Sequence, residues 1–444
     1  MHTLQRTRKS LIRLIHWRIW RGRMLVWLAA ALAALMIVMF ARMVDLAIDG
    51  FNHLRQLAPW SPLLLTGGGG MLIAWLTQRY FKGAQGSGIP QVIAALHIPD
   101  DAPGKRFLVS WRIAAGKILL GSAALGCGFS SGREGPSVQV GASLMYAVRH
   151  VLPRRFPVQP QHLILAGGAA GIAAAFNTPL AGIVFAIEEL GRKFEERTNG
   201  VLLTAIILAG VISISLQGNY TYFGRLAVTV VDSRLALPIL LSGIIAGLCG
   251  GIFSRLMLLG AKPWPGKLGW LKSRRPVLFA GLCGLLVAVL GLLSAGAAHG
   301  SGYLPTQQAL SGSAPLPFLY AFEKMAATLF SYFAGIPGGI FAPSLAVGAG
   351  LGQDLASLNL VDINAAAWIA LCMAAFLAAV TQAPITSFVI VMEMIDGHAM
   401  VISLIAAAFL ASLVSRAISP PLYHSLAQGF ITRDQTTATS PARH

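Results

Sequence analysis

Three short glycine and proline segments interrupt the apolar sequence, and their residue types could bind an anion. They are Gly86-Ser87-Gly88-Ile89-Pro90, Gly132-Arg133-Glu134-Gly135-Pro136 and Gly339-Ile340-Phe341-Ala342-Pro343. Glycine allows a tight bend, and proline in the first turn of a helix lacks an N–H that would have no partner there. Several such helix N-termini, each with about half a positive charge, would together hold a small anion. The alternative is that these segments are ordinary kinks, which membrane helices tolerate.

Glu134 is the most informative ionisable residue of these segments. A carboxylate inside an apolar region is costly and usually marks a functional site. We expect ionised Glu134 to occupy the anion site in place of the substrate, and protonation to release it. Proton and anion would then compete through one side chain. Arg133 is either the partner of Glu134 or only a source of positive potential, and the sequence leaves both interpretations open.

The elements that must position these residues are membrane helices. The chain has 444 residues, of which 55% are hydrophobic and 11% charged, whereas soluble domains are about 25% charged. Apolar runs close to the roughly 20 residues that span a bilayer occupy 24–44, 107–130, 201–217, 236–260, 277–298, 365–380 and 399–415. These runs are continuous, unlike the alternating strands of membrane barrels. The predicted fold class is an all-α polytopic membrane protein.

The basic residues indicate topology and do not indicate a nucleic-acid partner. The formal net charge is +18, and the densest basic cluster precedes the first apolar run: Arg6, Arg8, Lys9, Arg13, Arg18, Arg21 and Arg23. Segment 1–23 is therefore predicted to be cytoplasmic and attracted to anionic membrane lipid, in a multi-pass protein of a bacterial inner membrane. The run 24–44 is too long for the apolar region of a cleaved signal peptide.

Other kinds of chemistry have little support in the sequence. The four cysteines lie in apolar segments and the ten histidines lack metal-ligand spacing, so no metal and no cofactor is predicted. Gly128-Phe-Ser-Ser-Gly132 fits the nucleophile elbow of serine hydrolases, with Ser130 as the nucleophile, but it lies in a helical membrane run without the required strand and triad partners. A membrane hydrolase is the rival function from a different class.

An internal repeat organises the chain into halves of about 24–217 and 236–425. Segment 132–142 matches 339–349 at an offset of 207, and Lys117 and Lys324 share this offset. Further on, segment 179–188 matches 384–393 at an offset of 205. Two related halves are typical of transporters, whose substrate sites lie at interrupted helices. The residues alone do not show whether the repeat is inverted or parallel.

With these motifs in view, residues 61–425 resemble the CLC family of chloride channels and proton-coupled chloride transporters. The three segments occur in the family's order, with Ala174-Ala-Phe-Asn-Thr-Pro-Leu-Ala-Gly182 between the second and third. The resemblance implies an inverted-repeat fold with broken helices, and a homodimer with one anion pathway per subunit. It implies that chloride is bound by the hydroxyls of Ser87 and Tyr423 and the backbone N–H groups of Ile340 and Phe341.

The resemblance also assigns the two proton-transfer residues. Glu134 corresponds to the external gating glutamate, and Glu189 to the internal glutamate of exchanger members. From the sequence alone, Glu188 and Glu189 could equally form a solvated helix end after the apolar run 169–187, and Tyr423 could be an interfacial belt residue. The leading hypothesis is chloride/proton exchange, and a passive chloride channel on the same scaffold is the alternative.

Two departures from the family pattern affect these expectations. Many exchanger relatives have acidic residues just after the first motif, where this chain has Gln91 and Ile93, so we expect proton delivery to Glu189 to differ from theirs. Only 21 residues follow Tyr423, and segment 426–444 is a short tail. We therefore expect no paired cytoplasmic regulatory domains.

Overall fold

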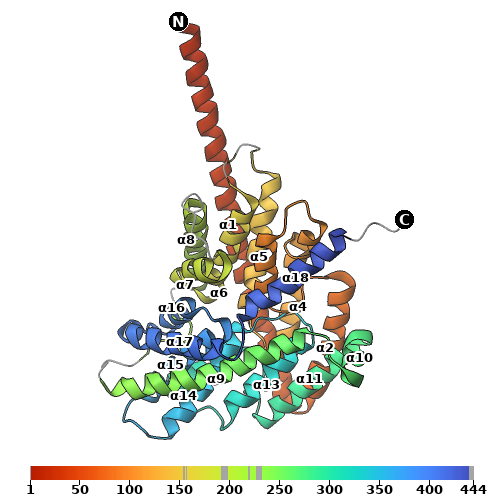
Figure 1. Ribbon diagram of the computed structural model, residues 1–444, viewed down its shortest axis with the longest axis vertical. Coiled ribbons are helices and arrows are strands. Elements are labelled where there is room, and N and C mark those ends of the chain that lie inside the picture. The colour runs from red at the N-terminus through yellow and green to blue at the C-terminus, as the bar shows by residue number, and fades with distance from the viewer. Residues whose placement is uncertain are drawn as a thin grey trace.

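The computed structural model describes residues 2–153, 156, 158–191, 199–218, 221–226 and 233–439, and it confirms the predicted all-α fold (Figure 1). The helices of the first half are α1 (His2–Leu57), α2 (Ser61–Tyr80), α3 (Ile89–His97), η1 (Pro103–Phe107), α4 (Trp111–Gly126), α5 (Glu134–Ala147), η2 (Val148–His150), α6 (Pro160–Phe176), α7 (Pro179–Phe185), the π-helix η3 (Ala186–Gly191) and α8 (Asn199–Gln217). Those of the second half are η5 (Ser233–Leu235), α9 (Ala236–Ala261), α10 (Gly266–Arg274), α11 (Pro276–Leu293), α12 (Tyr303–Leu310), α13 (Tyr320–Phe333), α14 (Phe341–Ser357), α15 (Ala365–Thr381), α16 (Pro384–Ile395), η6 (His398–Met400), α17 (Val401–Arg416) and α18 (Leu422–Thr439).

Helix α1 continues through the predicted N-terminal segment without a break, and its N-terminal end projects beyond the other helices (Figure 1). Arg21 and Arg23 of the basic cluster are exposed. The other members of the cluster, Arg6 to Arg18, lie outside the residues whose side chains the structure describes. At the opposite end of the chain, α18 runs through the predicted tail as far as Thr439.

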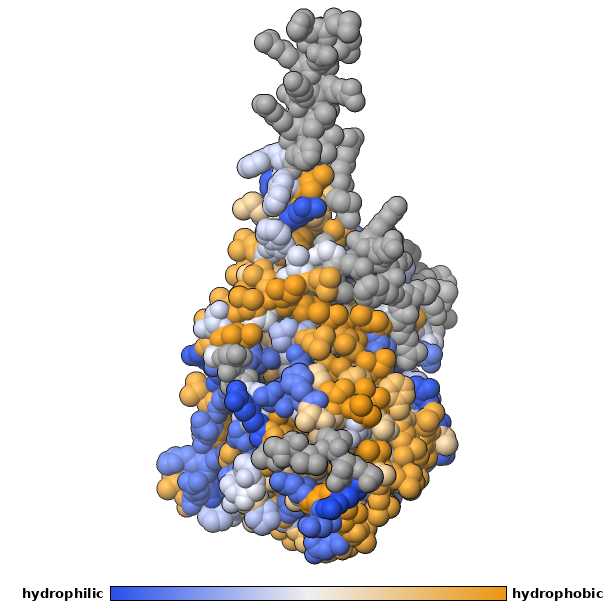
Figure 2. Space-filling model, turned by 90° about the vertical axis from the view of Figure 1, so that its left-hand side faces the viewer, coloured by the Kyte–Doolittle hydropathy of each residue, from blue (hydrophilic) through white to orange (hydrophobic). Residues whose placement is uncertain are grey.

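Five helical segments in the described part of the chain are long and apolar enough to cross a membrane. They are Ile19–Leu57, Pro103–Gly126, Ala236–Ala261, Pro276–Leu293 and His398–Arg416. Large apolar side chains on several of these helices are exposed, for example Leu256 on α9 and Leu282 on α11. Figure 2 shows broad apolar areas at the surface, and lipid can cover such areas.

The two remaining predicted runs, 201–217 and 365–380, correspond to shorter apolar helices. Helix α15 is buried at every residue from Ala366 to Thr381. Its hydrophobicity therefore reflects a position in the protein core and not contact with lipid. A run of this length does not by itself distinguish a buried core helix from a membrane span.

The internal repeat is also visible in local structure. Asn177 and Gln382 end α6 and α15 in the left-handed conformation, with φ of 59° and 58°. These two residues are separated by the same offset of 205 that relates segments 179–188 and 384–393. Close packing repeats as well, because a Cβ at Gly141 would lie 2.2 Å from the Gly167 carbonyl and a Cβ at Gly348 would lie 2.5 Å from the Cys372 carbonyl.

The repeat is inverted, as the family resemblance implies. Gly132 and Gly339, which occupy equivalent positions in the two halves, form an antiparallel bridge. Each donates its N–H to the carbonyl of the other, and both N···O distances are 2.7 Å. Reciprocal antiparallel pairing of equivalent residues is what a two-fold axis between the halves produces.

Candidate functional site

The three glycine and proline segments meet at the centre of the fold. The first segment contacts the residues just before the third: the N–H of Gly86 donates to the Ile336 carbonyl at 3.0 Å, and the N–H of Gly338 donates to the Gly86 carbonyl at 3.1 Å. The second joins the third through the bridge between Gly132 and Gly339. Helices α3, α5 and α14 therefore all begin beside the same small region.

Glycine is required where the first and second segments approach each other. A Cβ at Gly135 would lie 2.3 Å from Ser87 Oγ. A Cβ at Gly88 would lie 2.7 Å from the Gly135 carbonyl, and Gly88 has a φ of 106° that other residues rarely adopt. Because Gly88 and Gly135 have no side chains, the start of α5 can pack directly against Ser87.

Ser87 and Tyr423 form the polar part of this region. Ser87 is 3% exposed and Tyr423, in the first turn of α18, is 0% exposed. The hydroxyls lie near each other, and neither makes a hydrogen bond of ordinary geometry within the described protein. Since buried polar groups are normally satisfied, these two hydroxyls are available to a ligand. The burial of Tyr423 also shows that the interfacial-belt interpretation is wrong.

Ile340 and Phe341 lie at the start of α14, opposite these hydroxyls in the predicted site. Ile340 is the N-cap and Phe341 is the first helical residue. The first N–H groups of a helix have no carbonyl partner within it. The Phe341 ring stacks on Tyr423 with a centroid separation of 5.9 Å and an interplanar angle of 10°, which brings the start of α14 beside the Tyr423 hydroxyl.

Glu134 is the first residue of α5 and is completely buried. Its side chain folds back over Gly132, where an added Cβ would lie only 2.1 Å from Glu134 Oε2. The carboxylate lies near its own N–H and that of Ala342, without a hydrogen bond of ordinary geometry to either. Two helix N-termini, those of α5 and α14, thus face the carboxylate and favour its ionised form.

Arg133 forms an ion pair with Asp45 of α1. Arg133 Nη1 lies 2.9 Å from Asp45 Oδ1 and donates to the Ala41 carbonyl at 3.2 Å, so the guanidinium is held by α1. It also lies close enough to act electrostatically on Glu134. Asp45 was not found from the sequence, because its only signal is an acidic residue near the end of a long apolar helix.

A cavity of about 650 Å³ leads to Glu134 from the side where α1 ends. Arg133, Glu134 and Asp45 line it, together with Asp49 and Arg55 of α1. A buried carboxylate at the wall of a cavity that also has charged lining residues can exchange protons with water there. We name this cavity the outer vestibule, after the external position that the family resemblance implies for Glu134.

Glu189 lies on the other side of the site and is not a solvated helix end. Glu189 is only 2% exposed. The predicted apolar run is not one helix: α6 ends before Asn177, and the chain continues as α7 and then as the π-helix η3, which contains Glu189. Glu189 Oε1 lies 3.5 Å from His424 Nδ1. His424 follows Tyr423 directly, so α18 carries both an anion-site candidate and the neighbour of the inner carboxylate. No pattern in the sequence indicated a role for His424.

Gln91 and Ile93, the two departures from the family pattern, are both buried in α3. The Gln91 side chain accepts from the Gly88 N–H at 3.1 Å and donates to the Gln85 carbonyl at 2.6 Å. Gln91 therefore holds the backbone around Ser87 in place. Ile93 is 1% exposed and contributes an apolar side chain to the core.

Two buried lysines also position the site. Lys117 is completely buried and donates to the Gly86 carbonyl, next to Ser87. Its repeat equivalent, Lys324, donates to the carbonyls of Ala298 and Gly300 at 3.0 and 2.7 Å. Lys117 thus fixes the backbone next to Ser87, and the shared offset was the only sequence signal for it.

Glu188 has a different role from its neighbour Glu189. Its carboxylate accepts from the N–H groups of Ile385 and Thr386 at 3.1 and 2.6 Å, at the start of α16. Its repeat equivalent, Glu393, accepts from Leu180 and Ala181 at 3.2 and 2.6 Å, at the start of α7. Each half therefore caps a helix of the other half.

Ser130, the nucleophile of the rival hydrolase hypothesis, is buried between the halves. Its hydroxyl lies 2.9 Å from the Thr328 hydroxyl, and its N–H donates to Ser331 Oγ at 3.0 Å. These contacts join the segment before α5 to α13. They give Ser130 a structural role.

Comparisons with known proteins agree with this architecture. The family model described as voltage gated chloride channel matches residues 69–416. The H(+)/Cl(-) exchange transporter ClcA of Klebsiella pneumoniae subsp. pneumoniae is 32% identical over 380 residues, which cover 83% of this chain and 79% of that protein. ClcA of Salmonella typhi is 32% identical over 363 residues, covering 79% and 75%.

Solved structures show the same fold. A slow cyanobacterial Cl-/H+ antiporter aligns with a TM-score of 0.80 and 25% identity, covering 94% of this chain and 99% of that one. A CLC-type fluoride/proton antiporter aligns with a TM-score of 0.75 and 22% identity, covering 93% and 98%. The class that the fold defines is a multi-pass membrane transporter, and not an enzyme. The chain belongs to the voltage-gated chloride channel family, the CLC family.

Proposed function

We propose that this protein exchanges chloride for protons across the membrane. The observation that carries the proposal is the placement of two buried carboxylates, Glu134 and Glu189, on either side of the unsatisfied hydroxyls of Ser87 and Tyr423. Relatives named H(+)/Cl(-) exchange transporters support the same activity. The mechanism requires no metal and no cofactor, and chloride is the bound substrate ion.

The anion-binding step in this proposal uses neutral donors. Chloride accepts hydrogen bonds from the Ser87 and Tyr423 hydroxyls and from the N–H groups of Ile340 and Phe341 at the start of α14. Helix N-termini supply partial positive charge, and Lys117 remains bonded to Gly86. An anion held by partial charges is released more readily than one paired with a mobile lysine or arginine.

The proton step uses the two carboxylates in turn. Ionised Glu134 competes with chloride for the N-termini of α5 and α14. A proton from the outer vestibule neutralises it, so the side chain leaves the site and chloride enters. Glu189 passes the proton to the other side of the membrane. His424 is a second titratable group beside Glu189, at a position from which it can share that proton.

A passive chloride channel is the second candidate, and the α3 sequence favours it. Ile93 offers no carboxylate near Glu189, so proton delivery depends on Glu189 and His424. The two functions differ in one measurement on reconstituted liposomes. An exchanger driven by a chloride gradient moves protons against their own gradient, whereas a channel leaves the proton distribution unchanged. If Ile93→Glu raises the proton-to-chloride flux ratio, the missing carboxylate limits the exchange.

We also propose a homodimer in a bacterial inner membrane with the N-terminus in the cytoplasm. Exposed apolar residues on α7, α16 and α17, including Leu180, Ile385 and Ile402, form a face that a second copy could cover. Light scattering on the purified protein, corrected for bound detergent, tests the dimer. A protease-accessible tag at the N-terminus tests the topology.

A further inference from the structure

A second cavity of about 360 Å³ lies at the ends of α3 and α5 that are farthest from the anion site. It is enclosed by the loop after α3, by η1 and the start of α4, and by the last turn of α5 with η2. Met145 and Val148 at this end of α5 pack in one cluster with Val26 of α1, whereas Arg133 at the start of α5 contacts Asp45. The second cavity and the outer vestibule therefore lie on opposite sides of the molecule.

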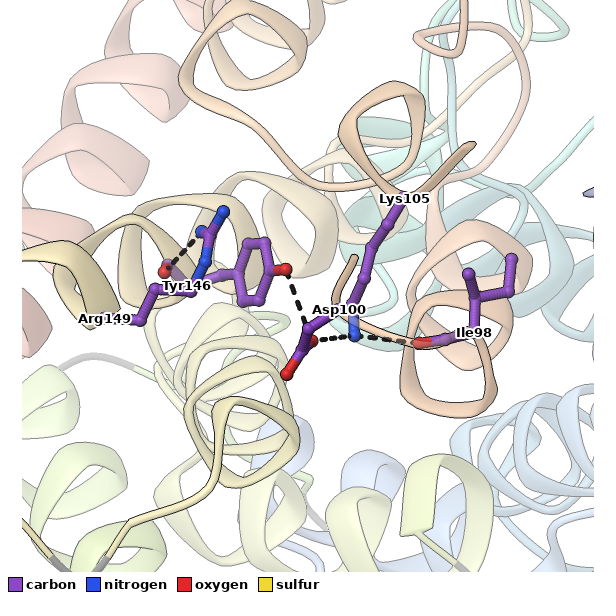
Figure 3. Close-up of polar contacts among 5 residues, drawn as sticks. All are labelled: Ile98, Asp100, Lys105, Tyr146 and Arg149. Atoms are coloured by element: carbon purple, nitrogen blue, oxygen red, sulfur yellow. Dashed lines mark hydrogen bonds and ion pairs between the residues drawn. The ribbon is translucent and has the colours of Figure 1, made fainter. Parts of the chain in front are cut away.

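One wall of the second cavity is a network of polar contacts around the buried residue Lys105 (Figure 3). Lys105 is 1% exposed, donates to the Ile98 carbonyl at 2.9 Å and pairs with Asp100. The Tyr146 hydroxyl donates to Asp100 Oδ1 at 3.3 Å. The Arg149 guanidinium lies 3.5 Å from the centroid of the Tyr146 ring. Lys105 thus offsets the charge of Asp100, and the wall joins the ends of α3 and α5.

The other lining groups suit an anion. Arg106 and His150 line the cavity and are exposed. Arg149 also lines it; its Nη1 donates to the Tyr146 carbonyl at 2.9 Å, and the guanidinium has further N–H donors. The N-terminus of α4, at Ser110, also faces the cavity. The exposed carboxylate of Asp101 lies at the same cavity and opposes anion binding.

Ser143 supplies an independent indication of a ligand. This residue lines the cavity from α5, is 0% exposed, and its hydroxyl has no hydrogen-bond partner in the described protein. A buried hydroxyl without a partner is costly. An oxygen-rich ligand in the cavity would satisfy it.

We propose that this cavity binds the phosphate group of an anionic ligand, supplied by a membrane phospholipid headgroup or by a soluble phosphate ester. Arg106 and Arg149 provide guanidinium donors, which match phosphate geometry. Trp111 and Phe107, at 72% and 43% exposure, flank the cavity at the start of the candidate span Pro103–Gly126. Exposed aromatic residues there are typical of the membrane interface.

The choice of membrane face rests on the proposed topology, but binding itself does not. The cavity lies on the side of the N-terminal half of α1, which we place in the cytoplasm, where anionic lipids are concentrated. If the flux assay shows no chloride/proton exchange, the proposal of a phosphate site is not affected. The two proposals are therefore tested separately.

The test is the thermal unfolding of the full-length protein in lipid vesicles. Vesicles of pure phosphatidylcholine are compared with vesicles that contain about a quarter phosphatidylglycerol, and glycerol 3-phosphate is added to the pure vesicles as the soluble arm. The variants are Arg106→Gln, which removes a donor, and Ser143→Leu, which fills the cavity. The matched control is Arg112→Gln, because Arg112 is exposed on the first turn of α4 and does not line the cavity.

We expect the unfolding temperature of the wild type to rise by a few degrees in at least one arm, since a ligand stabilises the folded state that it binds. The arm that produces the rise identifies the source of the phosphate. The rise should be lost in Arg106→Gln and Ser143→Leu and kept in Arg112→Gln, and Asp101→Asn should enlarge it. Equal rises in all variants, or none in the wild type with either ligand, would overturn the proposal. Comparing rises, and not absolute temperatures, keeps the result valid if a variant is less stable.

Discussion

The two halves of the molecule share a backbone but differ at the residues proposed to move protons. At the offset of 207, Glu134 corresponds to Phe341, and at the offset of 205, Glu189 corresponds to Met394. Both counterparts are buried apolar residues. By contrast, Glu188 and Glu393 are alike and cap each other's helices. Residues common to both halves build the scaffold, and Glu134 and Glu189, which have no acidic equivalent in the other half, break its symmetry.

The same comparison separates two uses of a helix N-terminus. The starts of α5 and α14 have equivalent serines, Ser137 and Ser344, whose hydroxyls donate to the carbonyl four residues earlier at 2.8 and 2.7 Å. The local structure is therefore the same in both halves. The start of α5 carries Glu134, while the start of α14 carries the ring that packs on Tyr423. The same backbone arrangement supports the proposed proton acceptor in one half and an apolar ring in the other.

The largest effect is expected for Glu134→Gln, which makes the two helix starts alike in charge. A neutral amide mimics the protonated acid, so chloride flux should persist while proton transport falls below detection. In the wild type, chloride flux should rise as the external pH falls, because protonation releases the gate, and the variant should lose this dependence. Chloride-driven proton uptake in liposomes provides the measurement. If Glu134→Gln still takes up protons in response to a chloride gradient, Glu134 is not the proton acceptor.

Glu189→Gln should also abolish proton movement while chloride still passes, because the anion is expected to reach Ser87 by a route that does not include Glu189. Glu188→Gln is the matched control, since this neighbouring carboxylate caps α16. It should lower stability and leave the proton-to-chloride flux ratio unchanged. Equal flux ratios in the wild type and in Glu189→Gln would shift support to the channel or to another proton route.

Ser87→Pro tests the anion site that both halves surround. The substitution removes the side-chain hydroxyl that is proposed to donate a hydrogen bond to chloride. The preference should shift several-fold from chloride toward nitrate in competitive flux measurements. An unchanged flux ratio would exclude Ser87 as a determinant of selectivity.

Asp45→Asn tests the ion pair that only the first half possesses. Loss of the carboxylate leaves the charge of Arg133 unbalanced beside Glu134, which favours the ionised gate. The rise of chloride flux should therefore move to a more acidic external pH. Asp49→Asn is the control, because Asp49 lines the same cavity. A shift to less acidic pH, or an equal shift in both variants, would contradict this role.

The smallest effect on transport is expected for Glu393→Ala, a change to the shared scaffold. It removes the acceptor for the Leu180 and Ala181 N–H groups, and loss of a helix cap costs about 0.5–2 kcal/mol. The unfolding temperature should fall while the proton-to-chloride ratio stays at the wild-type value. A changed ratio would show that the shared residues do more than stabilise the fold.

The sequence by itself determined the fold class, the repeat and the starts of three helices. These features depend on local properties, namely apolar runs, the conformational freedom of glycine and the missing N–H of proline. The burial of Glu134 also followed from its place in an apolar stretch. The proposed functions of these residues stay predictions until the flux measurements are made.

Only the tertiary structure decided which distant groups meet. It paired Arg133 with Asp45, placed His424 beside Glu189 and made Glu188 a cap for the opposite half. It also showed that α15 lies in the protein core. These contacts join residues far apart in the chain, and they depend on how helices pack. Local hydrophobicity shows that a helix avoids water, but packing decides whether lipid or protein surrounds it.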